Sequence, residues 1–408
     1  MLIKMEDILI WNGTIWTLDD PEIICNGWLT AAGGVITAVG QGEPPVYLQA
    51  ETVIDAKGHI LMPGLVDCHT HLMEYATAEI HHTQGQAQEM AAISNLLTAL
   101  QAGIVATGEH HLGHLVLSMP MAQYKKIRDM LPMASAIAYG CCWLGFEPKV
   151  LTSATWPGRS ETRDTLTDRD YELMAEASEF PGENIFMNYT CANVPLAAAP
   201  NAGTVTYEES QLRHIIELFH KKGKKIGAHI EGDEAARRFL ACGGDVIHHG
   251  HGISPETGAI MAKQKIPLVL TPAAGTSKRP TSPEEALAFY RQGIFLALAS
   301  DSYIYPHPQA DWISLPKDRL SGPADFLKVS GPVLRYFVEN GVKKSDALRL
   351  ITVNPRQLLH PEEGCAVLKP GCPADMILCS RLPAIETESL EDILLVITRG
   401  QIQVDRQI

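Results

Sequence analysis

Two hydrophobic patterns divide the chain. Near the N-terminus, short β-rich runs are separated by Asn-Gly and Gly-Gly pairs such as Asn12-Gly13, and the same style returns at 375–379 and 393–398. Short strands joined by such pairs predict a small antiparallel sheet. We therefore expect both chain ends to build one composite β-sandwich domain, from residues 1–60 and 360–408.

Between these ends, residues 61–359 alternate apolar, β-branched runs with segments of helical length and spacing. This alternation is typical of βαβ units around a parallel sheet. Eight apolar runs lie near 65–68, 104–107, 134–139, 185–189, 225–228, 246–248, 266–270 and 294–299. Helical segments lie at 86–102, 206–222, 233–241 and 283–292. The sequence predicts an α/β fold, a (β/α)8 TIM barrel that carries the small β-sandwich domain.

Histidines and carboxylates gather where these runs end. In barrels of this kind, the loops after the C-terminal ends of the strands form the active site. The residues at these ends are His69, His71, Glu109, His110, His111, His229, Glu231, His248, His249, His251 and Asp301. A random scatter of 16 histidines would not concentrate at strand ends in this way.

Composition narrows the class of partner. The 408 residues include 33 Lys plus Arg and 47 Asp plus Glu, a formal net charge of −14. Nucleic acids and anionic membranes both reward clustered positive charge, so neither is expected as a partner. The expected partner is a small-molecule substrate, and assembly as a homo-oligomer stays open.

The cysteines and the N-terminus bear on the compartment. Nine cysteines are scattered without a Cys-x-x-Cys pair, which argues against a disulfide framework and favours a reducing compartment. The N-terminal sequence lacks a signal-peptide pattern, and no apolar run has the length to span a bilayer. We expect a cytoplasmic protein.

His69 and His71 are two residues apart on an extended segment, so both side chains project to the same side and can reach one ion. Alone, a His-x-His pair is a weak signal, because histidines often satisfy local hydrogen bonds. His229 and Asp301 would add a third nitrogen and a carboxylate oxygen, completing a mixed site with room for water. Four convergent ligands predict one divalent metal ion, zinc in the first place, with iron or manganese as alternatives.

A metal in such a site lowers the pKa of bound water and so produces a hydroxide that can attack a carbonyl or amidine carbon. Asp301 is expected to accept the proton of that water and pass it to the leaving nitrogen. His249 is expected to polarise the substrate oxygen or orient the hydroxide. His248 is expected to be inward or structural, because neighbours on a strand point to opposite faces.

The predicted substrate contacts are His110, His111, Asn188 and Trp143, which follow the second, third and fourth apolar runs or stand at their ends. Each also has a structural or surface role as its alternative, because pockets use only a few placed polar groups. Further candidates near the mouth are His81, His82, His114, Cys141, Cys142, Tyr303, Tyr305 and His307.

Several segments resemble the amidohydrolase superfamily, and the likeness spans nearly the whole chain. Residues 62–72, Met-Pro-Gly-Leu-Val-Asp-Cys-His-Thr-His-Leu, look like its entry into strand one. The fifth and sixth strands resemble its imidazolonepropionase-like and prolidase-like members at 228–238 and 245–250, and 299–302 looks like its strand-eight aspartate segment. Residues 352–355 and 368–375 resemble the segments that close these proteins.

The resemblance implies hydrolysis of a carbon–nitrogen bond. It also implies that the metal ligands are His69, His71, His229 and Asp301, with His249 near the reacting centre. Two-metal, prolidase-like members carry a bridging carboxylated lysine at the end of strand four, whereas 184–190 contains none, which favours one metal.

Another departure concerns the proton shuttle. Deaminase-like members place an acidic shuttle three residues after the strand-five histidine, whereas Glu231 follows His229 by two and position 232 is glycine. This spacing argues against nucleobase deamination. Glu231 or Asp233 remains a candidate shuttle if the backbone bulges there.

The main hypothesis is a metal-dependent amidohydrolase that cleaves a non-peptide carbon–nitrogen bond in a cyclic or linear amide. Its first alternative is an aminohydrolase that deaminates a heterocyclic amine, and ammonia release would separate the two. A catalytically inactive barrel kept as a binding protein would bind no stoichiometric metal. An iron-dependent redox enzyme usually has two histidines and one carboxylate, so it fits the ligand set less well.

Overall fold

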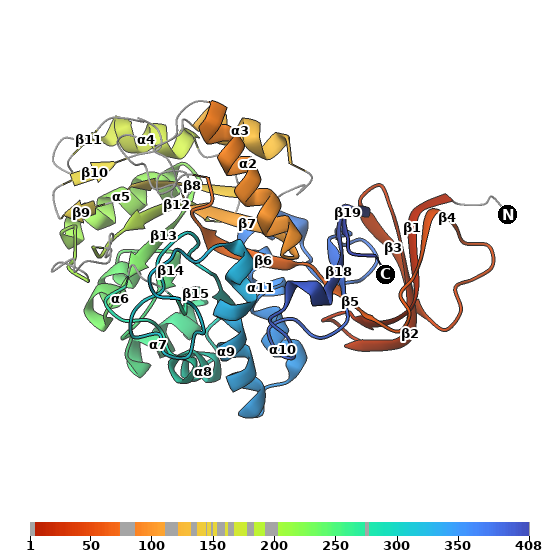
Figure 1. Ribbon diagram of the computed structural model, residues 1–408. Coiled ribbons are helices and arrows are strands. Elements are labelled where there is room, and N and C mark those ends of the chain that lie inside the picture. The colour runs from red at the N-terminus through yellow and green to blue at the C-terminus, as the bar shows by residue number, and fades with distance from the viewer. Residues whose placement is uncertain are drawn as a thin grey trace.

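Two eight-stranded sheets organise the protein in the computed structural model. The structure describes residues 5–73, 86–110, 121–131, 137–143, 145–147, 150–152, 160–161, 167–177, 183–191, 203–273 and 277–407. Figure 1 shows a sheet-rich part, which holds β1 and β19, beside a larger part in which helices surround strands. Buried apolar side chains of both sheets, such as Leu29 and Leu268, belong to one contiguous cluster.

Strands from both ends of the chain share the first sheet. Its strands are β1 (Met5–Trp16), β2 (Ile23–Ala32), β3 (Val35–Gln41), β4 (Gln49–Asp55), β5 (Ile60–Pro63), β17 (Met376–Cys379), β18 (Ile393–Thr398) and β19 (Gln401–Asp405). The order is β19-β18-β17-β5-β1-β2-β3, and β4 pairs with β1. The two ends meet where β5 pairs antiparallel with β17, with Met62 opposite Ile377. Hydrogen bonds join all these strands into one sheet, so a two-layer sandwich stays a prediction.

The Asn12-Gly13 pair does not separate two strands, which corrects the sequence prediction. Asn12 has a φ of 56°, and the register between β1 and β2 shifts on both sides of Gly13. Such a shift is a β-bulge, which bends a strand without ending it. Beyond the bulge β1 continues, and Thr14 pairs with Ile60 of β5. The Gly33-Gly34 turn does connect β2 to β3.

The second sheet is parallel throughout. Its strands are β6 (Leu65–Thr70), β7 (Ile104–His110), β8 (Ile137–Trp143), β12 (Glu183–Asn188), β13 (Lys225–Ile230), β14 (Val246–His249), β15 (Leu268–Leu270) and β16 (Leu296–Leu298). The order follows the sequence from β6 to β16. Each of the eight predicted apolar runs overlaps one of these strands, because buried parallel strands are marked by continuous apolar residues.

The first and last strands of this sheet come together at their C-terminal ends. The backbone N–H of Asp301, after β16, donates to the carbonyl of His69 on β6 at 3.0 Å. Thr70 and Ser302 form an isolated parallel bridge at the same place. The segment that carries Asp301 is therefore held beside the segment that carries His69 and His71.

Helices follow most of these strands. They are α2 (Gln86–Gln101), α3 (Met121–Asp129), α4 (Asp168–Ala177), α5 (Glu209–Lys221), α6 (Asp233–Ala241), α7 (Pro255–Gln264), α8 (Pro283–Arg291), α9 (Phe326–Glu339), α10 (Lys344–Arg349) and α11 (Val353–Leu359), with short 3-10 helices η1 (Pro323–Asp325), η2 (Pro361–Glu363) and η3 (Leu390–Asp392). The four predicted helical segments overlap α2, α5, α6 and α8. In α5, Leu212, Ile215, Ile216 and Phe219 are buried at helical spacing, so this face packs on the core.

Helix starts follow the local sequence. The Ser254 side chain accepts a hydrogen bond from the backbone of Thr257 before α7, and Ser282 does the same before α8. Proline follows each serine, because its fixed φ suits the first helical position. Within the described residues, no helix combines the length and the apolar character needed to cross a membrane. The short antiparallel strands β9 (Gly145–Glu147), β10 (Val150–Thr152) and β11 (Ser160–Glu161) were not predicted.

One disulfide joins Cys365 to Cys372, which the sequence analysis did not predict. The chain turns back between them, where the Cys372 N–H donates to the Lys369 carbonyl, and the two Cα atoms are 5.6 Å apart. This pair spans only seven positions of sequence and is no framework. The described free cysteines are Cys25, Cys68, Cys191, Cys242 and Cys379.

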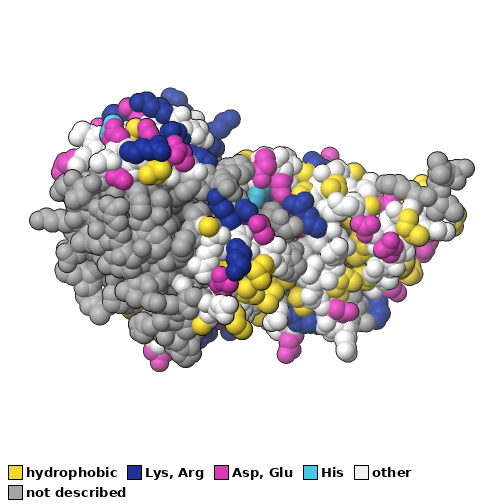
Figure 2. All heavy atoms as spheres, turned by 90° about the horizontal axis from the view of Figure 1, so that it is seen from above, with side chains coloured by type: hydrophobic (Ala, Val, Ile, Leu, Met, Phe, Trp, Pro, Cys, Tyr) yellow, Lys and Arg dark blue, Asp and Glu magenta, His cyan; other side chains and the backbone are white. Residues whose placement is uncertain are grey.

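The surface carries charges of both signs. Figure 2 shows Lys and Arg side chains close to Asp and Glu side chains on the described part of one face. Ion pairs include Lys126 with Glu89 at 3.0 Å and Arg169 with Glu172 at 3.1 Å. Solvent and salt screen exposed pairs of this kind, so the fold depends on the core rather than on them.

Candidate metal centre

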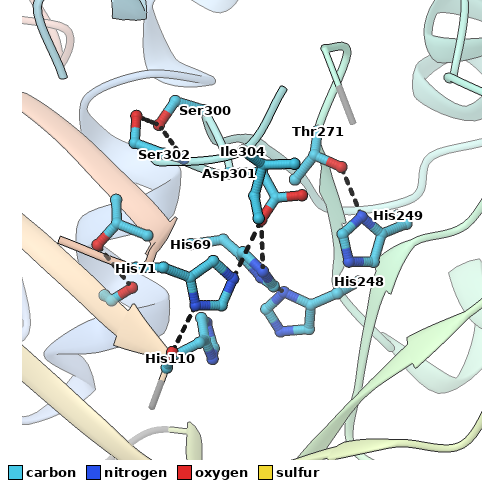
Figure 3. A network of polar contacts seen from close by, with 12 residues as sticks. His69, His71, His110, His248, His249, Thr271, Ser300, Asp301, Ser302 and Ile304 are labelled. Atoms are coloured by element: carbon cyan, nitrogen blue, oxygen red, sulfur yellow. Dashed lines mark hydrogen bonds and ion pairs between the residues drawn. The ribbon is translucent and has the colours of Figure 1, made fainter. Parts of the chain in front are cut away.

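Side chains from the ends of five strands meet at the C-terminal end of the parallel sheet. Figure 3 shows five histidines and Asp301 turned toward one another. The residues of this region, each at most 5% exposed, are His69, His71, His110, His229, Glu231, His248, His249 and Asp301. Burying so many polar groups is costly unless they bind each other or a ligand, which indicates a functional site.

Asp301 is the meeting point of His69 and His71. Its Oδ1 atom is 3.4 Å from Nε2 of His69 and 3.2 Å from Nε2 of His71. Burial alone would raise the pKa of Asp301, but hydrogen bonds and charge from these histidines hold it well below its usual range. Asp301 is therefore a carboxylate at neutral pH.

The tautomer of His71 makes this contact informative. His71 Nδ1 lies 2.6 Å from the carbonyl oxygen of His110, which can only accept, so Nδ1 carries the proton. In a neutral ring, Nε2 then presents a lone pair to Asp301. Two acceptors facing each other at 3.2 Å need a proton or a cation between them. Burial lowers the pKa of His71, but Asp301 outweighs burial and the net shift is upward, as expected for a site that attracts positive charge.

These residues fit a divalent cation. One ligand atom from each of His69, His71 and Asp301 can be chosen so that all lie within 4.8 Å of one another. Burial lowers the pKa of His69 to about 4, so that ring is neutral and has a lone pair. Imidazole nitrogen and carboxylate oxygen are the donors that zinc and related metals take.

His229 is separated from His69, His71 and Asp301 by the ring of His249. Its ring centroid is 4.2 Å from that of His249, which is in turn 5.1 Å from His69. His229 Nε2 is buried and makes no hydrogen bond within the described residues, although Glu231 Oε1 is 3.4 Å away. The structure therefore brings three of the four predicted ligands together and places the fourth beside them with an open nitrogen.

His249 is held by a hydroxyl group. Its Nδ1 atom is 2.6 Å from Oγ1 of Thr271, at the end of β15. Burial keeps the pKa of His249 well below its usual range, so its ring is neutral. A neutral ring has one protonated and one unprotonated nitrogen, so the contact with Thr271 decides which of the two Nε2 is.

His248 is part of the cluster and is fully buried, as expected of an inward or structural residue, but His248 and His249 do not face opposite sides, since the rings of both lie close to that of His69. His248 Nδ1 is 2.7 Å from Nδ1 of His69, and both rings are buried. His249 has a φ of 68°, so the chain leaves the extended conformation there and side chains no longer alternate. His69, His110 and His248 form a second group whose nitrogens lie within 4.8 Å.

Glu231 connects the centre to a pocket. Both of its carboxylate oxygens lie 2.7 Å from the backbone N–H of Lys278, which donates to them. Gly232 has a φ of 87°, so the chain turns directly after Glu231. A pocket of about 310 Å³ begins here, lined by Gly203, Glu231, Gly232, His251, Gly252, Lys278 and Arg279. Glu231 thus lies between His229 and this pocket despite its unusual spacing.

The predicted substrate contacts fall in different places. Asn188 ends β12 opposite His229, and its buried Nδ2 has no hydrogen-bond partner among the described residues. His110 packs on His69, with ring centroids 4.1 Å apart, and its Nε2 lies 3.2 Å from the Cys68 carbonyl. Trp143 ends β8, and its side chain lies outside the described part of the structure, as does all of His111.

Two buried carboxyl groups, Asp67 and Glu109, hold the segments that carry the predicted ligands; the sequence analysis gave Asp67 no role and placed Glu109 only among the polar residues at the strand ends. Asp67 accepts hydrogen bonds from the backbone and the hydroxyl of Ser300, next to Asp301. Glu109 accepts from the backbone N–H groups of Leu72 and Met73, next to His71. Burial raises the pKa of each carboxyl to about 7. A carboxylate inside an otherwise apolar strand is the sequence signal that points to such a role.

Comparison with known proteins places this geometry among hydrolases. A family model described as the amidohydrolase family matches residues 60–402. An imidazolonepropionase from Stenotrophomonas maltophilia is 28% identical over 331 residues, covering 72% of this chain and 76% of that protein. An adenine deaminase from Mesorhizobium japonicum is 22% identical over 397 residues, covering 95% of this chain but 56% of that protein.

Solved structures share the fold. A prolidase complexed with N-methylphosphonate-L-proline superimposes with a TM-score of 0.72 at 15% identity, covering 98% of this chain and 100% of the other. An adenosine deaminase from Xanthomonas campestris with bound zinc has a TM-score of 0.70 at 14% identity, covering 99% and 94%. At this identity the likeness concerns the fold alone.

Proposed function

Because the chain belongs to the amidohydrolase family and is a hydrolase acting on carbon–nitrogen bonds, we propose that it hydrolyses a cyclic or linear amide other than a peptide bond, using one metal-activated water. The observation that carries the proposal is the buried contact between His71 Nε2 and Asp301 Oδ1, 3.2 Å apart, which needs a proton or a cation between its two atoms. His69, His71 and Asp301 would hold a divalent cation here, and that cation would supply the Lewis acidity that activates water.

We also propose that the parallel strands close into a (β/α)8 barrel formed by residues 61–359, with residues 1–60 and 360–408 as the small domain. The bridge between Thr70 and Ser302 supports closure, because it joins the first strand, β6, to the segment that directly follows the last strand, β16. The site then lies at the face where such barrels carry their active sites.

The proposed ligands are His69, His71, His229 and Asp301, and the proposed metal is a single zinc ion. A one-metal site is supported by residues 183–191, which cover β12 and the loop start after it and include no lysine that could bridge two metals. The free Nε2 of His229 supports it as a further ligand. When bound, the metal supplies a Lewis acid that lowers the pKa of a coordinated water toward 7.

The chain's own groups then handle protons and orientation. Asp301 Oδ1 is a carboxylate oxygen with histidine nitrogens on two sides, which suits a group that takes a proton and returns it to a leaving nitrogen. If the Thr271 hydroxyl donates to Nδ1 of His249, the Nε2–H of His249 becomes a donor for a substrate oxygen. Burial of these groups excludes bulk water and strengthens their electrostatic interactions.

The substrate side is proposed to include Glu231, Asn188 and the pocket beside them. Glu231 borders both His229 and the pocket, so it can hold a proton between the metal centre and bound substrate. The unpaired Nδ2 of Asn188 can donate to a substrate oxygen. His110, His111 and Trp143 stay predicted contacts.

A second candidate is deamination of a heterocyclic amine. The likeness to adenine deaminase over 95% of the chain favours it, and so does the contact of Glu231 with His229, which gives an acidic group near the centre despite the altered spacing. Deamination releases ammonia, whereas hydrolysis of a cyclic amide opens the ring and hydrolysis of a linear amide releases an amine.

The test is a screen of zinc-loaded protein against cyclic amides, N-acyl amino acids, hydantoins and amino-heterocycles, with ammonia and new carboxylate measured separately. New carboxylate without ammonia supports the amidohydrolase proposal, and stoichiometric ammonia supports the alternative. Asp301→Asn is the matched control, since it keeps size and loses the proton acceptor. Turnover that survives in Asp301→Asn, or a protein that binds no metal, would rule out the proposed mechanism.

A further inference from the structure

The two histidines of the His-x-His pair are supported in different ways. Both turn Nε2 toward Asp301 Oδ1, at 3.4 Å for His69 and 3.2 Å for His71. The opposite nitrogen of His71 lies 2.6 Å from the backbone carbonyl of His110. The opposite nitrogen of His69 lies 2.7 Å from another imidazole nitrogen, Nδ1 of His248. Figure 3 shows both arrangements.

This difference matters because a carbonyl and an imidazole impose different constraints. A carbonyl oxygen only accepts, so it fixes the proton of His71 on Nδ1 and leaves Nε2 open. A neutral imidazole nitrogen either donates or accepts, so the contact between His69 and His248 has two arrangements. In one, His69 donates from Nδ1 and its Nε2 has a lone pair. In the other, His248 donates, and the proton of His69 lies on Nε2, where it blocks a metal.

We propose that His248 is a positioning residue for the metal centre: its Nδ1 accepts the Nδ1–H of His69 and holds His69 in the tautomer whose Nε2 binds the metal. The inference rests on the proposed metal ligands and adds a residue outside that set. It corresponds to the general finding that partners of a ligating histidine fix its tautomer and ring orientation.

The surroundings of His248 suit this role. The residue is fully buried in β14, where its backbone pairs with His229 on one side and Val269 on the other. Its backbone is therefore fixed by two neighbouring strands, and its buried ring has little room to swing away from His69. The contact also joins strands far apart in sequence, since His69 and His248 are separated by 179 positions.

A competing arrangement uses the same atoms. His69, His110 and His248 have nitrogens within 4.8 Å and form an all-nitrogen group. A cation held there would need the lone pair of His69 Nδ1 if it is to bind on the side of His248. The proposed hydrogen bond places a proton on that atom, so the two arrangements exclude each other and an experiment can separate them.

The first experiment compares the zinc affinity of the full-length wild type with two substitutions at position 248, by competition with a chromophoric chelator. His248→Leu removes the acceptor, and we expect zinc affinity to fall about 10- to 100-fold, as for other partners of ligating histidines. His248→Asn keeps an acceptor oxygen near the position of Nδ1, and we expect affinity within about threefold of wild type. His360→Leu is the control for loss of a buried histidine outside the centre and should leave affinity unchanged.

Two results would overturn the inference. Unchanged affinity in His248→Leu would show that the hydrogen bond is dispensable. Equal loss in His248→Asn and His248→Leu would show that His248 itself binds the ion or that only its ring shape matters. If the wild type binds no zinc, the proposed function fails along with this inference, whereas wild-type binding with unchanged His248→Leu affinity contradicts the inference alone.

A second measurement does not depend on how the variants fold. Long-range proton–nitrogen NMR spectra of the zinc-loaded wild type distinguish protonated, unprotonated and metal-bound ring nitrogens. We expect His69 to carry its proton on Nδ1 and the metal on Nε2. Zinc on Nδ1 of His69, or a proton on its Nε2, would contradict the inference.

Discussion

Asp67 on β6 accepts hydrogen bonds from both the backbone N–H and the hydroxyl of Ser300, the residue directly before Asp301, with the backbone bond at 3.0 Å. The two residues are 233 positions apart in sequence, and both are buried. Asp67 is two residues before His69. This contact therefore sets the position of the segment that carries Asp301 relative to the segment that carries His69 and His71.

Removing this contact should loosen the centre. Asp67→Ala leaves the buried N–H of Ser300 without its acceptor and the Ser300 hydroxyl with only its contact to the Ser302 hydroxyl, and we expect a loss of about 2 to 4 kcal/mol in the free energy of unfolding. Urea denaturation measures this loss. Ser300→Ala, which removes only the hydroxyl, is the matched control and should cost clearly less. Equal stability of Asp67→Ala and wild type would show that other contacts hold the two segments.

His249 should act on the reaction more than on metal binding. Its Nδ1 is held by Thr271, and its Nε2 is the proposed donor to a substrate oxygen. We expect His249→Ala to lower kcat by about 10²- to 10³-fold, the usual loss for one oxyanion donor, while zinc affinity changes little. Steady-state kinetics and zinc competition on the same preparation check both parts. A variant that keeps its kcat, or that loses its zinc, would contradict the assigned role.

Thr271→Val provides the matched variant for the orientation of His249. Valine keeps the shape of threonine and removes the hydroxyl that contacts Nδ1 of His249. We expect Thr271→Val to lower kcat about tenfold, less than His249→Ala does. In a protein that already carries His249→Ala, adding Thr271→Val should not change kcat further, because both substitutions act through one hydrogen bond.

Acid should weaken a contact far from the centre. The pKa of Asp392 is lowered from 3.8 to about 2, mainly by a hydrogen bond from the Arg381 side chain. Hydrogen bonds from Ser380 and Thr387 add to this effect, while partial burial opposes it. A carboxyl whose pKa is lower in the folded state adds stability above its unfolded pKa and loses it as pH falls. We expect the stability advantage of wild type over Asp392→Asn to be constant above pH 5 and to fade between about pH 4 and 2. Thermal melts across this range check it, and a gap that does not change with pH would disagree with this shift.

The strands could be predicted better than the contacts between side chains. Eight apolar runs marked the parallel strands because a buried strand needs apolar residues on both faces. For the same reason His69, His71 and Asp301 could be placed at one face, since the C-terminal ends of parallel strands share an edge. Two local predictions were wrong: a turn at Asn12-Gly13, and opposite faces for His248 and His249. Both depend on a residue with positive φ, Asn12 in the first case and His249 in the second.

Long-range polar contacts could not be predicted. Nothing in the local sequence pairs Asp67 with Ser300 or His69 with His248, since each contact exists only once the strands are neighbours. The Cys365–Cys372 disulfide was missed because an odd number of scattered cysteines says little about one local pair. Substrate contacts are harder still, since they depend on the loops between strands.

The central claim is a single functional metal ion at His69, His71 and Asp301. It is tested most directly by counting zinc ions per chain by mass spectrometry after zinc loading and dialysis, for wild type and for His71→Ala. We predict one ion in wild type and almost none in His71→Ala, and removal of the ion by a chelator should lower Tm because bound metal stabilises the folded state. Two ions per wild-type chain, or one ion retained in His71→Ala, would contradict the account.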